Sequence, residues 1–183
     1  MHSSPICATG RASSPTSEPV ARLFLAVRPD PATVERLAQL DRSAATGVRW
    51  VPPEQWHITL RFWSDADADD VMGALEGVRL PGADVMLGPI VSRLGRDTVV
   101  VPASGVDELA AVVRSATDEV LPREQRPFVG HLTLARLRHR AACGVAGERF
   151  TATFSPTSVD LVESVLRPDG ARHRTIATWP LVS

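Results

Sequence analysis

Two short strings of the chain combine residue types that can transfer protons. The string HITL spans residues 57–60 and HLTL spans 131–134, and together they use two of only five histidines. Because successive side chains of a β-strand point to opposite faces, the His and the Thr of each string share one face. Two such strands facing each other across a cleft would present two imidazoles and two hydroxyls, a set suited to acid–base chemistry on a phosphate. These four residues are His57, Thr59, His131 and Thr133.

The duplication is what separates this pattern from an ordinary surface strand. A single His-x-Thr commonly marks polar outward positions and nothing more. A copy of the pattern retained only for packing would need its Ile and Leu positions, not its His and Thr positions. We therefore favour a catalytic interpretation of the pair.

The chain has the composition of one globular domain behind a tail. Its 183 residues are 44% hydrophobic, and no apolar run approaches the roughly 18–20 residues of a membrane helix. Residues 1–20 are rich in Ser, Pro, Ala and Gly and lack an apolar signal-peptide core, so we expect a disordered tail. Residues 21–183 are expected to form a single domain. Neither Cys7 nor Cys143 has a disulfide or zinc-type partner, and a cytoplasmic location is expected.

The charged residues limit the possible mechanisms. All twenty basic residues are Arg, so the lysine of a P-loop and lysine-linked covalent intermediates are both excluded. From Pro122 onward there are nine Arg and five acidic residues, against eleven and sixteen before it. This modest positive excess suits a substrate with a few phosphates rather than long duplex. Tyr is absent and aromatic residues make up 5% of the chain, which argues against a base-stacking sheet.

Hydrophobic periodicity and breakers predict alternating strands and helices. Helices are expected over 30–40, 64–80 and 107–121, and a weak turn or short helix over 141–147. Strands are expected over 22–27, 48–51, 57–63, 85–87 and 98–101, then from 131, and over 151–154, 159–165 and 172–179. The order predicts an α+β fold of two pseudo-symmetric lobes. Each lobe would be an antiparallel sheet with helices on its outer face, and the cleft between them would carry the two motif strands.

Several strings resemble one known family. The paired His-x-Thr motifs resemble the 2H phosphoesterase superfamily, and the flanking strings resemble its RNA 2′,3′-cyclic phosphodiesterases, also called 2′-5′ RNA ligases. The tail and residues 80–121 match poorly. The matching strings are RLFLAV (22–27), RWVPPE (49–54), HITLRF (57–62), RPF (126–128), HLTLAR (131–136) and ESVLRPDGA (163–171).

The chain departs from the family pattern at three places outside the four motif residues. Gly130 stands where the family usually has Pro, and His173 where it usually has an aromatic residue, often Tyr. Ser64 and Asp65 stand where a Gly-Glu pair is usual. These departures bear on substrate preference rather than on chemistry, and His173 is a possible rim contact.

The resemblance implies hydrolysis of RNA 2′,3′-cyclic phosphate ends to 2′-phosphate, with neither metal nor cofactor. By the family pattern His57 donates a proton to the leaving 3′ oxygen and His131 accepts one from water, although symmetry leaves this assignment open in the sequence alone. Thr59 and Thr133 are expected to donate to non-bridging phosphate oxygens. Arg136, at the strand end, could contact phosphate, stack on a base or face solvent. By strict alternation Arg61 shares the face of His57.

Other functions remain open on the same residues. The site could run in reverse as an ATP-independent 2′-5′ RNA ligase, or it could open the cyclic phosphate of a small nucleotide. A non-catalytic binder of RNA ends is a further alternative, although it would tolerate loss of the His and Thr residues. The expected partners are RNA ends or small nucleotides bearing a 2′,3′-cyclic phosphate, with no membrane and a monomeric protein. His139 is expected at the surface and His2 in the tail.

Overall fold

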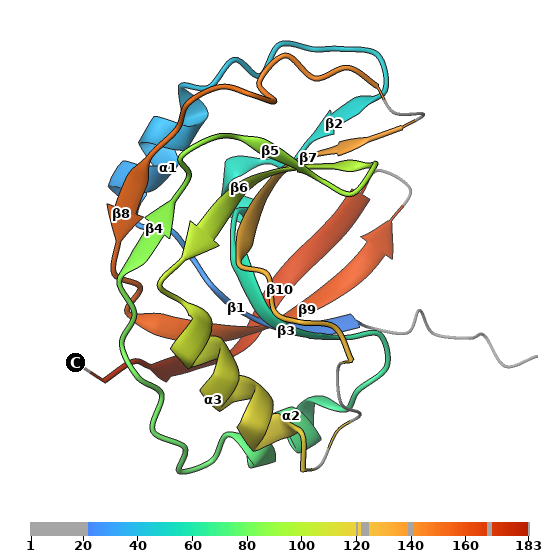
Figure 1. Ribbon diagram of the computed structural model, residues 1–183. Coiled ribbons are helices and arrows are strands. Elements are labelled where there is room, and N and C mark those ends of the chain that lie inside the picture. The colour runs from blue at the N-terminus through green and yellow to red at the C-terminus, as the bar shows by residue number, and fades with distance from the viewer. Residues whose placement is uncertain (1–21, 120, 122–124, 139–140, 168–169, 183) are drawn as a thin grey trace, which may run out of the picture.

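A single antiparallel sheet curls through the molecule in the computed structural model, which describes residues 22–119, 121, 125–138, 141–167 and 170–182 (Figure 1). The main path of the sheet runs β10-β9-β1-β3-β7-β6-β4-β8, with β2 paired to β7 and β5 to β6. The strands are β1 (Arg22–Val27), β2 (Val48–Trp50), β3 (Ile58–Trp63), β4 (Val85–Leu87), β5 (Ser92–Leu94), β6 (Thr98–Ser104), β7 (His131–Leu137), β8 (Ala152–Phe154), β9 (Ser158–Arg167) and β10 (Gly170–Pro180). The helices are α1 (Pro31–Ala38), the 3-10 turn η1 (Pro53–Gln55), α2 (Ala68–Ala74) and α3 (Asp107–Thr117).

The two motif strands join the two lobes. One lobe contains β10, β9, β1 and β3, and the other contains β7 with its neighbours β2, β6, β5, β4 and β8. The strands β3 and β7 meet antiparallel through one residue pair, Ile58 with Leu132. These are the middle residues of the two His-x-Thr motifs, so the motifs lie directly beside each other. The predicted α+β fold of two lobes, with the motif strands at their junction, is confirmed.

Helices α1 and α3 each pack on the lobe opposite to the one that contains the strand they follow, which is β1 for α1 and β6 for α3. Helix α1 contacts β8, whereas α3 contacts β3 and α2 (Figure 1). The side chain of Asp30 caps α1 by accepting a hydrogen bond from the Thr33 N–H at 2.7 Å, and Pro31 occupies its first turn, as predicted. The exchange of helices ties the two lobes into one packed unit.

The second helix is shorter than predicted. Residues 64–80 carry a helical pattern, but the helix spans only Ala68–Ala74. It begins where the Asp67 side chain accepts from the Asp69 N–H at 2.8 Å. Gly77 has a φ of +72°, in the left-handed region that follows many helix ends, so the chain turns away there. The weak element expected over 141–147 is a turn rather than a helix.

The apolar side of both motif strands lies in the main core, as the alternation predicts. Ile58, Leu60, Leu132 and Leu134 are at most 2% exposed and pack with the helices' buried faces. A second, smaller cluster of Phe24, Ala26 and Val162 lies apart from this core. Within the described part of the chain, no helix is long and apolar enough to cross a membrane. The predicted tail, with His2 and Cys7, and also His139 lie outside the described residues.

Candidate active site

A cleft of about 660 Å³ opens over the junction of β3 and β7. Five of the six predicted site residues line it, and the sixth, Arg61, does not. The five are His57, Thr59, His131, Thr133 and Arg136. The antiparallel pairing of Ile58 with Leu132 places His57 toward Thr133 and Thr59 toward His131, so that each imidazole has a hydroxyl from the other strand on its side.

A β-bulge corrects the prediction for Arg61. In the pairing of β1 with β3, Leu25 pairs with Arg61 and the next residue, Ala26, pairs with Thr59, so Leu60 is the extra residue. A bulge of this kind shifts the alternation of faces by one position. Arg61 therefore turns inward and is 1% exposed, with its guanidinium bonded to Asp118 and lying 5.4 Å from the Trp63 ring centre. Arg61 links β3 to α3 and does not line this cleft.

The second motif strand carries the same bulge at the matching place. Val99 pairs with Ala135 and Val100 with Thr133, which leaves Leu134 as the extra residue. Ala135 becomes fully buried and Arg136 turns to the cleft side. Strict alternation would have placed Arg136 opposite to Thr133. The bulge thus brings the predicted phosphate or base contact into the cleft at residue 136, and it brings Phe62 there at the equivalent position of β3.

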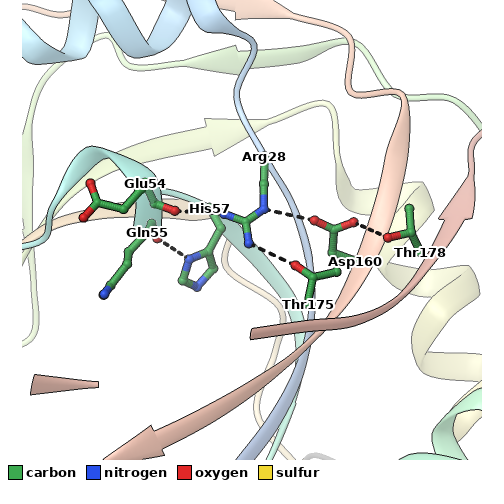
Figure 2. Close-up of polar contacts among 7 residues, drawn as sticks. All are labelled: Arg28, Glu54, Gln55, His57, Asp160, Thr175 and Thr178. Carbon is green, nitrogen blue, oxygen red and sulfur yellow. Dashed lines mark hydrogen bonds and ion pairs between the residues drawn. The ribbon is translucent and has the colours of Figure 1, made fainter. Parts of the chain in front are cut away.

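Both histidines are held through the same ring nitrogen. His57 Nδ1 lies 2.6 Å from the Gln55 carbonyl oxygen (Figure 2), and His131 Nδ1 lies 2.7 Å from the Val129 carbonyl oxygen. A carbonyl can only accept, so each Nδ1 carries the proton and donates it. A ring that carries its proton on Nδ1 alone has a lone pair on Nε2, which is available to a reacting group. The identical arrangement on two separate strands is the geometric counterpart of the sequence repeat.

The surroundings of His57 disfavour its charged form. Phe24 stacks on its ring at 4.6 Å between centres, and His173 meets it edge-on at 5.5 Å. Burial lowers the pKa of His57 to about 4. The hydrogen bond to Gln55 opposes this shift, whereas the charges of His173, Arg28 and His131 add to it. In the ligand-free cleft at neutral pH, His57 is therefore an uncharged imidazole.

The third histidine of the cleft is also shielded from water. His173 lines the cleft and meets Phe24 edge-on at 5.1 Å. Burial, and after it the charge of Arg28, lowers the pKa of His173. The predicted rim contact of His173 thus lies directly beside His57.

Arginines make the cleft attractive to anions. Arg49 of β2 and Arg136 of β7 are paired across adjacent strands, and burial followed by the charge of Arg49 lowers the pKa of Arg136. Two neighbouring guanidiniums repel each other, so a bound phosphate between them would be stabilising. Arg136 Nη1 also donates to Thr98 Oγ1 at 3.0 Å, which orients it. Arg22 and Arg172 line the same cleft, whereas Glu54 is its one acidic lining residue among those described.

Sequence reasoning missed several lining residues. Phe24, Phe62 and Leu166 give the cleft apolar surface, and the last two are 44% and 56% exposed. The position of Phe24 was predictable, because it shares a strand face with Arg22, opposite to the core residues Leu23 and Leu25. The position of Phe62 was not, since it depends on the bulge. No group of three or more His, Cys, Asp or Glu suited to a metal ion occurs among the described residues.

The comparisons with known proteins agree with this geometry. The family model described as LigT like Phosphoesterase matches residues 27–87, a range that includes the first motif and ends before the second. The comparison with curated protein sequences found no match.

Solved structures match over most of the chain. The crystal structure of E. coli LigT complexed with 3′-AMP is 24% identical, with a TM-score of 0.74, and covers 91% of this chain and all of that one. The structure of TT0787 of Thermus thermophilus is 25% identical, with a TM-score of 0.72, and covers 87% of this chain and 97% of that one. The PDE domain of MHV ns2 is 15% identical, with a TM-score of 0.55, and covers 78% of this chain and 99% of that one. The resemblance predicted from the two motifs is confirmed: the chain matches the LigT-like phosphoesterases of the 2H superfamily in family model over residues 27–87 and in fold over 91% of its length.

Proposed function

We propose that the protein hydrolyses RNA ends that carry a 2′,3′-cyclic phosphate and leaves a 2′-phosphate. The observation that carries this proposal is the pair of imidazoles with matching Nδ1 anchors in one arginine-lined cleft. Opening a cyclic phosphodiester needs a base for the attacking water and an acid for the leaving oxygen, on opposite sides of phosphorus. Two such imidazoles supply both without a metal ion.

The proposed reaction proceeds by one in-line displacement. Nε2 of His131 takes a proton from water while the water oxygen forms a bond to phosphorus. The bond between phosphorus and O3′ breaks, and protonated His57 gives its Nε2 proton to O3′. The phosphate stays on O2′, and one proton has moved from His57 to the product and one from water to His131, so that the site resets by exchange with solvent.

To act as the acid, His57 must take up a proton when the substrate binds. In the free cleft its pKa is about 4, so its charged form is scarce at pH 7. A bound phosphodiester places a negative charge beside Nε2 and favours the imidazolium. Protonation of His57 is thereby coupled to binding of an anionic substrate, which keeps the acid inactive until the substrate is in place.

The remaining cleft residues are proposed to bind the phosphate and the nucleotide. Thr59 and Thr133 lie one pleat from each histidine, within the cleft, and their hydroxyls donate to non-bridging phosphate oxygens. Arg136 contacts a phosphate or stacks on a base. E. coli LigT has been crystallised with 3′-AMP, with ATP and with NADP+, which supports a nucleotide as the occupant of the corresponding cleft in this chain.

The test is incubation of the purified protein, without metal or ATP, with a short oligoribonucleotide that ends in a 2′,3′-cyclic phosphate. Phosphorus NMR should show a 2′-phosphomonoester that forms with the wild type and not with His57→Ala or His131→Ala. A 3′-phosphate would reverse the leaving-group assignment. Adding an RNA with a free 5′ hydroxyl would test ligation in the same tube, and 2′,3′-cyclic mononucleotides would test a small-nucleotide substrate. Binding of the RNA end without turnover of any substrate would contradict the proposed hydrolysis.

A further inference from the structure

The carbonyl that fixes the His57 proton belongs to a short turn whose position depends on one arginine. Gln55 ends η1, and its carbonyl accepts from His57 Nδ1 at 2.6 Å. The carbonyl of the preceding residue, Glu54, accepts from Arg28 Nη1 at 3.0 Å (Figure 2). Arg28 follows the last residue of β1 and is not among the residues that line the cleft. Its contact with the site therefore runs through the main chain of Glu54 and Gln55.

Arg28 is itself held from two further sides. Its Nε donates to Asp160 Oδ2 of β9 at 3.0 Å, and its Nη2 donates to Thr175 Oγ1 of β10 at 3.4 Å (Figure 2). Asp160 is 14% exposed, and its other carboxylate oxygen accepts from Thr178 Oγ1 at 2.9 Å. A planar guanidinium with several partners in fixed directions has little freedom to move. Arg28 thus connects the turn that contains Gln55 to the strands β9 and β10 of the first lobe.

The side chain of Gln55 adds a second tie between this turn and β10. Its Nε2 donates to the Ala171 carbonyl oxygen at 3.1 Å. Trp56, the residue between Gln55 and His57, is 1% exposed in the core. The Gln55 carbonyl is therefore fixed on both sides, by a buried ring after it and by the Arg28 contact before it.

The corresponding anchor of His131 is built differently. Val129, whose carbonyl accepts from His131 Nδ1, is 58% exposed. The next residue, Gly130, is held by the main chain, since its carbonyl accepts from the Ala103 N–H at 2.9 Å. The two histidines share one type of hydrogen bond, but the His57 anchor rests on an arginine cluster and the His131 anchor on sheet pairing.

We propose that Arg28 is a positioning residue for His57, which acts by holding the Glu54–Gln55 main chain in the place that keeps the proton on Nδ1 and Nε2 free for the substrate. The kinetic part of this proposal rests on the proposed hydrolysis, whereas the part about the proton position does not. Arg28 also acts on His57 by charge, because it is one of the groups that lower its pKa.

Other charged or titratable groups lie in the same cleft as His57, and the test must separate the effect of Arg28 from theirs. His131 of β7 and His173 of β10 lower the pKa of His57 as Arg28 does. The remaining charged side chains of the cleft are Arg22, Arg49, Glu54, Arg136 and Arg172. Arg28 also lowers the pKa of His173, so the comparison that separates its charge from its hydrogen bonds is between Arg28→Lys, which keeps the charge, and Arg28→Met, which does not.

The experiment measures the His57 ring by ¹⁵N NMR and the hydrolysis rate in parallel, for Arg28→Met and Arg28→Lys. Arg28→Met removes both the hydrogen-bond donors of the guanidinium group and its charge. We expect kcat for a 2′,3′-cyclic phosphate substrate to fall about 10- to 100-fold, because small misplacements of a catalytic group have effects of that order. The ring should show a mixture of Nδ1–H and Nε2–H tautomers and a raised pKa, since a nearby positive charge is gone. Arg28→Lys keeps the charge, so the pKa of His57 should stay low while the tautomer mixture and a smaller loss of kcat remain.

The matched control is Arg174→Met. Arg174 forms an ion pair with Glu163 between the same strands, β10 and β9, but does not contact the turn at Glu54. The Arg174→Met variant should keep kcat within about twofold of the wild-type value and leave the His57 tautomer unchanged. If Arg28→Met does not fold, Asp160→Asn removes the carboxylate that orients Arg28 and should give the same tautomer mixture at reduced extent.

The outcomes are distinct. A purely Nδ1–H ring with wild-type pKa in Arg28→Met, or in Asp160→Asn where that variant replaces it, would overturn the proposal. So would a kcat loss no larger than that of Arg174→Met when both proteins are folded. If the wild type hydrolyses no cyclic phosphate, the proposed function fails, but the tautomer measurement still decides the role of Arg28.

Discussion

The strands β3 and β7 carry nearly the same motif, and the comparison of the two shows which parts of the repeat are shared. Each motif presents His and Thr to the cleft, each strand has a bulge at the last Leu of the motif, and each His anchors its Nδ1 on a carbonyl two residues upstream. The strands differ at the two positions after the bulge. The inward position is Arg61 in β3 and Ala135 in β7, and the cleft position is Phe62 in β3 and Arg136 in β7.

We infer that the shared and the different positions of the two motifs have different roles. The shared positions are those that a proton transfer at phosphorus needs twice, once for each side of the reaction. The positions that differ place apolar Phe62 and cationic Arg136 in the cleft. If the substrate is a nucleotide, as we propose, this asymmetry should give it one preferred direction. The His57 ring is also packed between Phe24 and His173. Under the proposed function, the repeated positions would carry out the proton transfers and the positions that differ would orient the substrate.

Removing either histidine should have the largest effect on activity. We expect His57→Ala and His131→Ala each to lower kcat by about 10²–10⁴-fold, the usual contribution of a general acid or base. The double variant should be little slower than the slower single variant, because the two groups act in one step. Initial rates on a cyclic phosphate substrate, with folding checked by circular dichroism, measure this. Equal and mild losses in both single variants would instead indicate a binding site without chemistry.

The packed surroundings of His57 should make protein stability depend on pH. Its pKa is about 4 in the folded protein and near 6.5 in the unfolded chain, so the unfolded state binds more protons between these values. Stability is therefore full above pH 6.5 and falls as pH drops toward 4, by up to roughly 3 kcal/mol from this group. Urea unfolding at pH 7, 5.5 and 4.5 should show this slope in the wild type and a smaller slope in His57→Asn. Thr59→Val, a change on the same strand that does not titrate, should keep the wild-type slope.

The two threonines should contribute less than the histidines and about equally. A hydrogen bond to a charged phosphate is worth about 1.5–3 kcal/mol, so Thr59→Val and Thr133→Val should each lower kcat/KM by about 10- to 100-fold. Steady-state kinetics with the cyclic phosphate substrate measure the loss. Thr→Ser at each position, which keeps the hydroxyl, should restore most of the activity. A threonine that Ser does not rescue would have a packing role instead.

A substitution of Arg61, the inward residue after the bulge in β3, should lower the stability of the protein and leave substrate binding unchanged. Arg61→Met removes the ion pair with Asp118, whose side chain is 28% exposed, so we expect a loss of about 1–2 kcal/mol rather than the larger value for a fully buried pair. KM should stay within about twofold. Chemical unfolding and steady-state kinetics together measure the two effects. A raised KM with unchanged stability would show that Arg61 reaches the substrate after all.

The same position shows why part of the site was predictable from the sequence and part was not. The alternation of His, Thr and apolar residues places His57, Thr59, His131 and Thr133 correctly, because residues two positions apart share a strand face when no bulge lies between them. A bulge depends on how neighbouring strands meet, and nothing in the strings at residues 57–62 marks Leu60 as the extra residue. Alternation therefore fails beyond it and misplaces Arg61. The lobes followed from the order of the elements, whereas the exchange of helices between lobes and the Arg28 cluster depend on contacts between distant segments.

Substitutions at the cleft position after the bulge, Phe62 in β3 and Arg136 in β7, should have the smallest effects on activity. The two should differ in how KM depends on salt. Arg136→Met removes a charge next to Arg49, so KM for an oligonucleotide should rise about 3- to 10-fold, and its dependence on salt should weaken, because one fewer cation binds phosphate. Phe62→Ala removes apolar surface, so any rise in KM should persist equally at low and high salt. Measuring KM between 50 and 300 mM salt for both variants separates the two. Matching salt slopes would mean that the cationic and apolar sides do not distinguish the ends of the substrate, and the proposed orientation by asymmetry would have to be abandoned.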